Sequence, residues 1–141
     1  MKRVKDLNFF KNIREVREFE FGIFYYFDGM VISEVKEGVV FGWEMAQKAV
    51  RAAHEVFGVN KPIAYISNRI NNYHVLAMDW AKFYKNREQL ISYAVVGQTH
   101  GSLASLVLEH MFFKNSIQQF SDIEEAIKWS LTKIEHTQEF V

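Results

Sequence analysis

The sequence predicts a single α/β domain: a mixed five-stranded sheet that opens with an N-terminal hairpin and carries four helices. Three observations support this fold class. Residues 16–27 show the period-two pattern of a half-buried strand. Residues 63–66 and 91–96 are short apolar runs, which are typical of central strands covered on both faces. Helical periodicity lies between these runs, and strands separated by single helices pair in parallel through crossovers.

The predicted hairpin joins residues 16–27 to a returning strand over residues 30–36. The dipeptide Asp28-Gly29 lies between them. It favours a two-residue turn, because both central positions of such a turn need positive φ. A last strand is expected over residues 116–120. Together with the two apolar runs, this makes five strands.

Four helices are predicted, over residues 43–57, 73–85 and 102–113 and from residue 121 onward. Gly58 is placed to end the first helix in a left-handed conformation. Ser121 and Glu124 fit a capping box at the start of the fourth helix, and Asp122 adds negative charge to its first turn. The expected buried stripes are Ala46, Ala49, Val50, Ala53 and Phe57 on the first helix, and Ile123, Ala126, Ile127, Leu131 and Ile134 on the fourth.

The two ends of the chain are expected to flank a domain over residues 15–136. Residues 1–14 form a basic leader whose apolar residues are expected to cover one edge of the domain, and a membrane surface or a partner is the alternative. Residues 137–141 are expected to be a tail, with fraying from residue 135. No secretory or membrane-spanning segment is present in the sequence, so we expect a cytoplasmic protein.

Composition excludes several classes of function. The 17 basic and 17 acidic residues balance, so the charge gives no preference for nucleic acid. With no Cys, thiolate chemistry is impossible. The sequence has neither a Gly-rich dinucleotide motif nor a phosphate loop, and no two His residues fall at i and i+4 on one helix. We therefore expect no cofactor and no metal, and we assign no catalytic residue.

The predicted binding site lies where two buried strands end. Parallel strands of an open sheet bring the loops that follow them to one edge, where the next helices offer free amides. The alternative is that these polar residues only cap helices and satisfy turns. The candidate ligand-binding residues are Ser67, Asn68, Arg69, Asn71, Asn72, Tyr73, His74, Thr99, His100 and Ser102.

Each functional hypothesis predicts a different observation. If the loops bind a ligand, Arg69→Ala weakens binding and changes stability by no more than about 0.5 kcal/mol. If the protein is instead a small enzyme with His74 or His100 as general acid or base, both imidazoles face one concave pocket. A third hypothesis is a structural subunit or homodimer with an exposed aromatic patch of Tyr73, Tyr84 and Trp129.

Residues 16–133 resemble a sulfate-transporter and anti-sigma-factor-antagonist (STAS) domain, and most closely its divergent bacterial branch, grouped with the CRAL-TRIO lipid-binding fold. The resemblance lies in the order of the elements and in two segments, 64–73 (AYISNRINNY) and 122–129 (DIEEAIKW). These segments are similar to patterns in uncharacterised proteins of marine Bacteroidetes.

The resemblance implies a non-enzymatic, regulatory module that binds a protein partner or a small anionic or lipidic ligand. STAS antagonists are switched by phosphorylation of a Ser within an Asp-Ser-Ser/Thr-Gly stretch. Here Asn71-Asn72-Tyr73-His74 occupy that place, with no hydroxyl pair and no Gly. The phosphorylation role is therefore not transferred to this chain.

Overall fold

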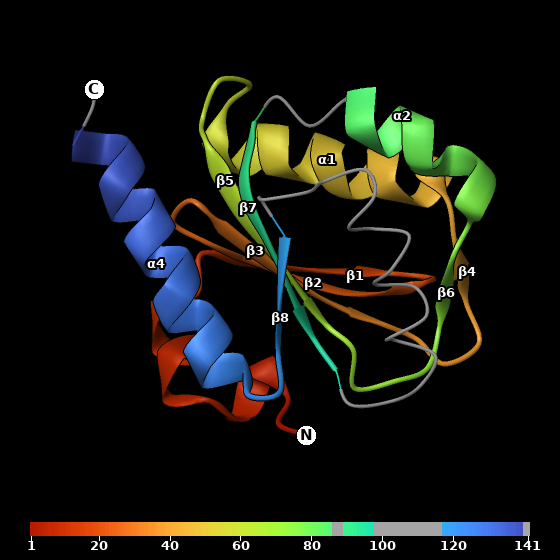
Figure 1. Ribbon diagram of the computed structural model, residues 1–141, viewed down its shortest axis with the longest axis horizontal. Coiled ribbons are helices and arrows are strands. Elements are labelled where there is room, and N and C mark those ends of the chain that lie inside the picture. Colours follow the sequence, from red (N-terminus) through yellow and green to blue (C-terminus); the bar gives the residue numbers. More distant parts are fainter. Residues whose placement is uncertain (86–88, 98–116, 140–141) are drawn as a thin grey trace.

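Six strands form one mixed sheet in the part of the chain that this computed structural model describes, residues 1–85, 89–97 and 117–139 (Figure 1). The order is β1-β2-β3-β5-β7-β8. The first three strands are antiparallel, and β3, β5, β7 and β8 are parallel, as the sequence predicted. The strands are β1 (Glu15–Phe19), β2 (Gly22–Phe27), β3 (Met30–Val35), β5 (Ile63–Asn68), β7 (Leu90–Val96) and β8 (Ile117–Phe120).

The sixth strand arises because residues 16–27, predicted as one strand, fold back on themselves to form β1 and β2. The alternation of side chains continues through the turn between them, so the pattern does not reveal it. The expected turn at Asp28-Gly29 is confirmed: Phe27 pairs with Met30, and Gly29 between them has a φ of 71°. The chain therefore opens with a three-stranded meander rather than a hairpin.

Three α-helices are described: α1 (Trp43–Phe57), α2 (Trp80–Lys85) and α4 (Ile123–Glu139). Helix α1 has the predicted bounds and ends at Gly58, whose φ is 88°. Helix α4 continues to Glu139, so residues 135–139, which were expected to fray, are helical. The helix predicted over residues 102–113 lies outside the described residues.

The single helix predicted over residues 73–85 is wrong. This segment contains β6 (His74–Val75), a 3-10 turn (Ala77–Asp79) and then α2. Strand β6 pairs in parallel with β4 (Val40–Phe41), so residues at the start of the expected helix are extended. Tertiary pairing between distant segments thus overrides a local helical pattern.

The predicted buried stripes need one correction on each helix. On α1, Ala52 is buried while Val50 is 38% exposed. On α4, Ser130 is buried while Leu131 is 36% exposed. In both helices the small residue faces the sheet, which lets the backbone approach closely.

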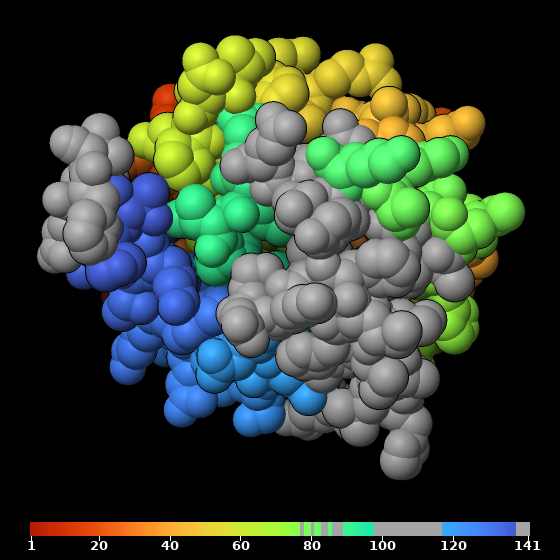
Figure 2. All heavy atoms as spheres, turned by 45° about the horizontal axis from the view of Figure 1, so that its top comes forward, coloured from red at the N-terminus to blue at the C-terminus, as the bar shows by residue number. Residues whose placement is uncertain are grey.

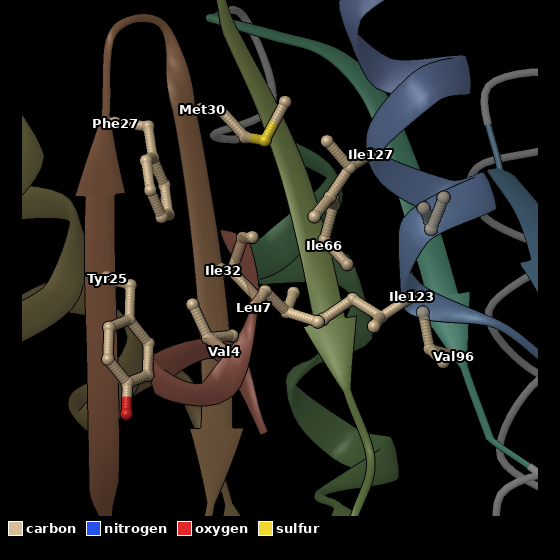
Figure 3. Packing of buried hydrophobic residues seen from close by; sticks show 12 residues of the cluster. Val4, Leu7, Tyr25, Phe27, Met30, Ile32, Ile66, Val96, Ile123 and Ile127 are labelled. Atoms are coloured by element: carbon tan, nitrogen blue, oxygen red, sulfur yellow. The ribbon is translucent and has the colours of Figure 1, made fainter. Parts of the chain in front are cut away.

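Two apolar cores lie on opposite faces of the sheet. One face is covered by α1, and the other by α4 together with the N-terminal segment (Figure 1). Figure 3 shows the second core, in which Val4 and Leu7 pack with residues of β2, β3, β5, β7 and α4. The apolar leader residues therefore cover a face of the sheet, not an edge. None of the helices in the described ranges is long and apolar enough to span a membrane.

Candidate functional site

The parallel strands end together at one edge of the sheet, here called the carboxyl edge. Asn68, the last residue of β5, is paired with Val96, the last residue of β7, and Val96 is paired with Phe120 at the end of β8. Arg69 N–H donates to the Val96 carbonyl over 2.8 Å. The strand ends from which the predicted loops 67–74 and 97–102 start therefore lie side by side, and the second loop lies outside the described residues from residue 98 on. Because side chains alternate along a strand, Ser67 and Asn68 point to opposite faces of the sheet.

On the α1 face, three of the predicted site residues, Ser67, Arg69 and Tyr73, contact one another. Arg69 Nε donates to Ser67 Oγ over 3.0 Å, and one of its terminal nitrogens donates to the hydroxyl of Tyr93 over 3.2 Å. The guanidinium lies 5.3 Å from the centre of the Tyr73 ring, and the Tyr73 hydroxyl lies 2.7 Å from Ser67 Oγ. Arg69 is only 2% exposed. These contacts make Arg69 part of a packed network within the fold.

Two of the predicted site residues contact the loop that follows β3. The side-chain Nδ2 of Asn71 donates to the Val35 carbonyl over 3.1 Å. Asn72 accepts a bond from Gly38 N–H through its carbonyl, and its own N–H donates to Glu37 Oε2 over 2.7 Å. These contacts tie the two loops together, as the structural alternative expected.

Of the two candidate histidines, only His74 lies in the described part of the chain. His74 lies in β6 with an exposed side chain, and its backbone N–H donates to the Val39 carbonyl over 3.0 Å. His100 lies outside the described residues, as do Thr99 and Ser102. Among the residues that the structure places, no three His, Asp or Glu side chains gather to form a metal site.

The prediction of an exposed aromatic patch is also wrong for Tyr73 and Trp129, the two members whose side chains are described. Tyr73 is buried in the core beneath α1. Trp129 packs on Phe120 on the opposite face of the sheet, with ring centres 5.5 Å apart. The Tyr84 side chain is outside the description. An exposed patch formed by Tyr73 and Trp129 does not exist.

On the α4 face, Asn68 belongs to a buried polar cluster that the sequence analysis missed. Its Nδ2 donates to Glu34 Oε2 over 2.9 Å and to the Lys2 carbonyl over 3.0 Å. Glu34 Oε2 also accepts the Val4 N–H over 2.8 Å, and Glu34 Oε1 accepts the hydroxyl of Tyr25 over 3.3 Å. The sequence held one signal for this cluster: Glu34 is a carboxylate within an otherwise mostly apolar segment. In the structure this segment forms β3, and every residue of β3 is buried. Glu34 and Asn68 together fix the N-terminal segment on the sheet.

The environment of this cluster changes the acidity of Tyr25. Burial raises the pKa of its hydroxyl to about 12, and the nearby Glu34 carboxylate acts in the same direction. The neighbouring Tyr26, on the other face, also has a raised pKa because of burial. Both hydroxyls therefore stay neutral at physiological pH.

A pocket of about 360 Å³ opens beside Asn68 at the carboxyl edge. We call it the carboxyl-edge pocket. It lies where the ends of β5 and β7, the start of α4 and the N-terminal segment meet. Farther along α4, Figure 2 shows residues 89–97 adjoining the later residues of this helix on the surface. Its described lining is Met1, Lys2, Asn68, Val96, Ser121, Asp122 and Ile123. Only Asn68 belongs to the predicted site.

The start of α4 gives the pocket a helix N-terminus. Asp122 Oδ1 accepts the backbone N–H of Glu124 over 3.3 Å, so Asp122 provides the cap that the sequence analysis assigned to Ser121 and Glu124. The Glu124 carboxylate instead forms an ion pair with Lys2. The hydrogen bond and charge of Glu124 raise the pKa of the Lys2 ammonium, which therefore remains positive at neutral pH.

One buried polar atom of Asn68 lacks a partner. Asn68 is 1% exposed, and within the described part of the chain its Oδ1 accepts no hydrogen bond. Its orientation is fixed, because Nδ2 faces two acceptors, Glu34 Oε2 and the Lys2 carbonyl. A rotated carboxamide would place its oxygen against both of them.

Comparisons of the chain with protein-family models, curated proteins and solved structures find no match.

Proposed function

We propose that this chain is a non-enzymatic, STAS-like regulatory module that binds a small anionic ligand in the carboxyl-edge pocket. The observation that carries the proposal is the position of that pocket, where Asn68, Val96 and the start of α4 meet. Ligands of open parallel sheets gather at the carboxyl ends of the strands. The pocket volume of about 360 Å³ falls in the range of small-molecule sites.

Two features favour an anionic ligand. Helix α4 is 17 residues long, and a helix carries a partial positive charge at its N-terminus, which the cap from Asp122 to the Glu124 N–H offsets in part. Lys2 adds a full positive charge to the lining. An anion in the pocket would share Lys2 with Glu124, its present partner.

The packing favours a small ligand over a lipid. Figure 3 shows side chains filling the space between α4 and the sheet, and Ile66, Val96 and Ile127 there are each at most 5% exposed. A lipid tail needs an apolar cavity, and these side chains occupy the place where it would lie.

The regulatory part of the proposal follows from the resemblance and from one departure from the family pattern. Residues 71–74, at the place of the phosphorylated stretch, are part of a loop and of β6 rather than the start of a helix. A phosphoserine switch at this place has no serine or threonine to act on. We therefore propose that ligand occupancy, rather than phosphorylation, changes the state of the module.

Calorimetric titration with propionate, L-lactate and inorganic phosphate at constant ionic strength tests this proposal. Saturable binding of at least one anion is expected, and Lys2→Gln is expected to weaken it by up to about fivefold, the range for an exposed charge contact. Lys61→Gln is the matched control, because Lys61 also pairs with a carboxylate, Asp28, beside the turn at Gly29. The proposal is overturned if none of the three anions binds, or if both variants weaken binding equally.

A further inference from the structure

We infer that strand β1 is an interface through which two copies of this chain pair antiparallel, with Val16 on the two-fold axis. The inference does not depend on the proposed function, because the described lining of the carboxyl-edge pocket contains no residue of β1. It comes from the position of β1 in the sheet and from the order of its side chains.

Strand β1 is an outer strand of the described sheet. β2 lies on one side of it, and no described strand lies on the other. Phe19 and Gly22 flank a two-residue turn, where hairpins place a hydrogen-bonded pair, and bonded and non-bonded pairs alternate from there. The backbone N–H and C=O groups of Val16 and Glu18 therefore point away from β2. Such groups form a template on which another strand can pair.

The side chains of β1 determine which strand fits this template. Val16 is 45% exposed, so the outer edge of the sheet presents apolar surface. Glu15 and Arg17, on either side of Val16, form an ion pair on the α1 face, and 37% and 35% of their side-chain surfaces are exposed. Charges on an outer strand usually discourage pairing with a foreign strand. Here they have opposite signs, so the strand that fits must carry the same two charges in the reverse order.

A second copy of β1 meets this requirement. When two copies pair antiparallel about an axis through Val16, the two valines lie opposite each other, and Glu15 of each copy lies opposite Arg17 of the other. Opposite charges at directly paired positions stabilise a sheet, and like charges destabilise it. Arg17 also donates to Glu55 on α1 over 2.8 Å, and a guanidinium has five N–H donors, enough for a further carboxylate.

The neighbouring registers are unfavourable, which fixes the axis at Val16. An axis through Arg17 would place this residue opposite its own copy and Val16 opposite Glu18. An axis through Glu15 would place two carboxylates opposite each other. Only the register centred on Val16 matches apolar with apolar and each charge with its opposite. The dimer is expected to be weak, because one pair of short strands buries less surface than a standard interface of about 1,600 Å².

Sedimentation velocity over a series of protein concentrations tests the inference, at low ionic strength because salt weakens exposed charge pairs. The native chain is expected to form a reversible dimer. Val16→Lys places two ammonium groups opposite each other and is expected to raise the dimer dissociation constant at least about tenfold. Val59→Lys is the matched control, because Val59 is 62% exposed and lies beyond the end of α1, and it is expected to associate like the native chain. A native chain that stays monomeric, or equal dissociation constants for the two variants, would overturn the inference.

Two charge variants test the register. Glu15→Arg and Arg17→Glu each give a chain with like charges at both positions, so each alone is expected to associate at least about tenfold more weakly than the native chain. In an equimolar mixture every charge again lies opposite one of the other sign, and mixed dimers are expected to form about as well as native dimers. Variants that associate like the native chain, or a mixture that stays monomeric, would contradict pairing of β1 in this register.

Discussion

Asn68 Nδ2 lies 2.9 Å from Glu34 Oε2, so the last residue of β5 donates to a buried carboxylate on the neighbouring strand β3. The same carboxylate oxygen accepts the N–H of Val4. One acceptor therefore connects the central sheet, the N-terminal segment and the wall of the carboxyl-edge pocket.

Replacing this carboxylate tests its role in stability. Glu34→Leu leaves the Val4 N–H without an acceptor and removes one of the two acceptors of Asn68 Nδ2, and we expect the free energy of unfolding to fall by about 3 kcal/mol. Glu34→Gln keeps one acceptor oxygen and is expected to cost about 1 kcal/mol or less. Urea denaturation measures both values. Equal losses in the two variants would contradict a hydrogen-bonding role.

Arg69 is expected to be structural, in contrast to the small effect that the sequence suggested. Arg69→Met removes the bonds to Ser67 and Tyr93 from a buried site, and we expect a loss of about 3 kcal/mol. Arg51→Met on the exposed side of α1 is the control, with an expected change within about 0.5 kcal/mol. Thermal and urea unfolding compare them. Matching stabilities of the two variants would show that the Arg69 network contributes nothing.

Alkaline pH is expected to destabilise the fold through Tyr25. Its pKa is about 12 in the folded protein and about 10 when unfolded, so the neutral hydroxyl is favoured by folding. The contribution of Tyr25 to the free energy of unfolding is fully present below about pH 10 and is lost as the pH rises from about 10 to about 12. Tyr25→Phe cannot ionise, so the stability difference between the native protein and this variant should narrow between pH 9 and pH 11.5. A constant difference would refute the assignment.

Replacement of Gly22 by a larger residue is expected to destabilise the fold, because the backbone of β3 leaves no space for a side chain at this position. A Cβ at this position would lie 2.6 Å from the Glu34 carbonyl oxygen and 2.8 Å from Val35 Cα. Since both atoms belong to backbone, Gly22→Ala is expected to cost about 3 kcal/mol. Gly38→Ala meets nothing within 4 Å and bears only the strain of a φ of 77°, which costs about 1 kcal/mol. If Gly22→Ala costs no more than Gly38→Ala, the close strand approach is absent in solution.

Local patterns predicted the parts of the fold that depend on local physics. The bounds of α1 and its end at Gly58, the turn at Gly29 and the parallel central strands all follow from periodicity and backbone preference. The turn before Gly22 was not predictable because the alternation of side chains continues through it, and the extended conformation of β6 was not predictable because it depends on pairing with the distant strand β4.

The sequence predicted where the candidate site lies, but not which side chains form it. The strand ends at Asn68 and Val96 do meet at one edge, as parallel pairing requires. Which polar side chains face a pocket depends on the face to which each one points and on what packs over it. Arg69 is buried against Ser67 and Tyr93 on the α1 face. Asn68 lies on the other face, beside the start of α4 and the N-terminal segment, and no local pattern indicates the position of that segment.

The most direct test of ligand binding at the carboxyl edge is a titration of ¹⁵N-labelled protein with L-lactate, followed by two-dimensional amide NMR. The account predicts saturable shifts centred on Asn68, Ile123 and Glu124, with the amides of Asp28 and Lys61 unchanged. Saturable shifts centred on Asp28 and Lys61, or no saturable shift at all, would contradict it.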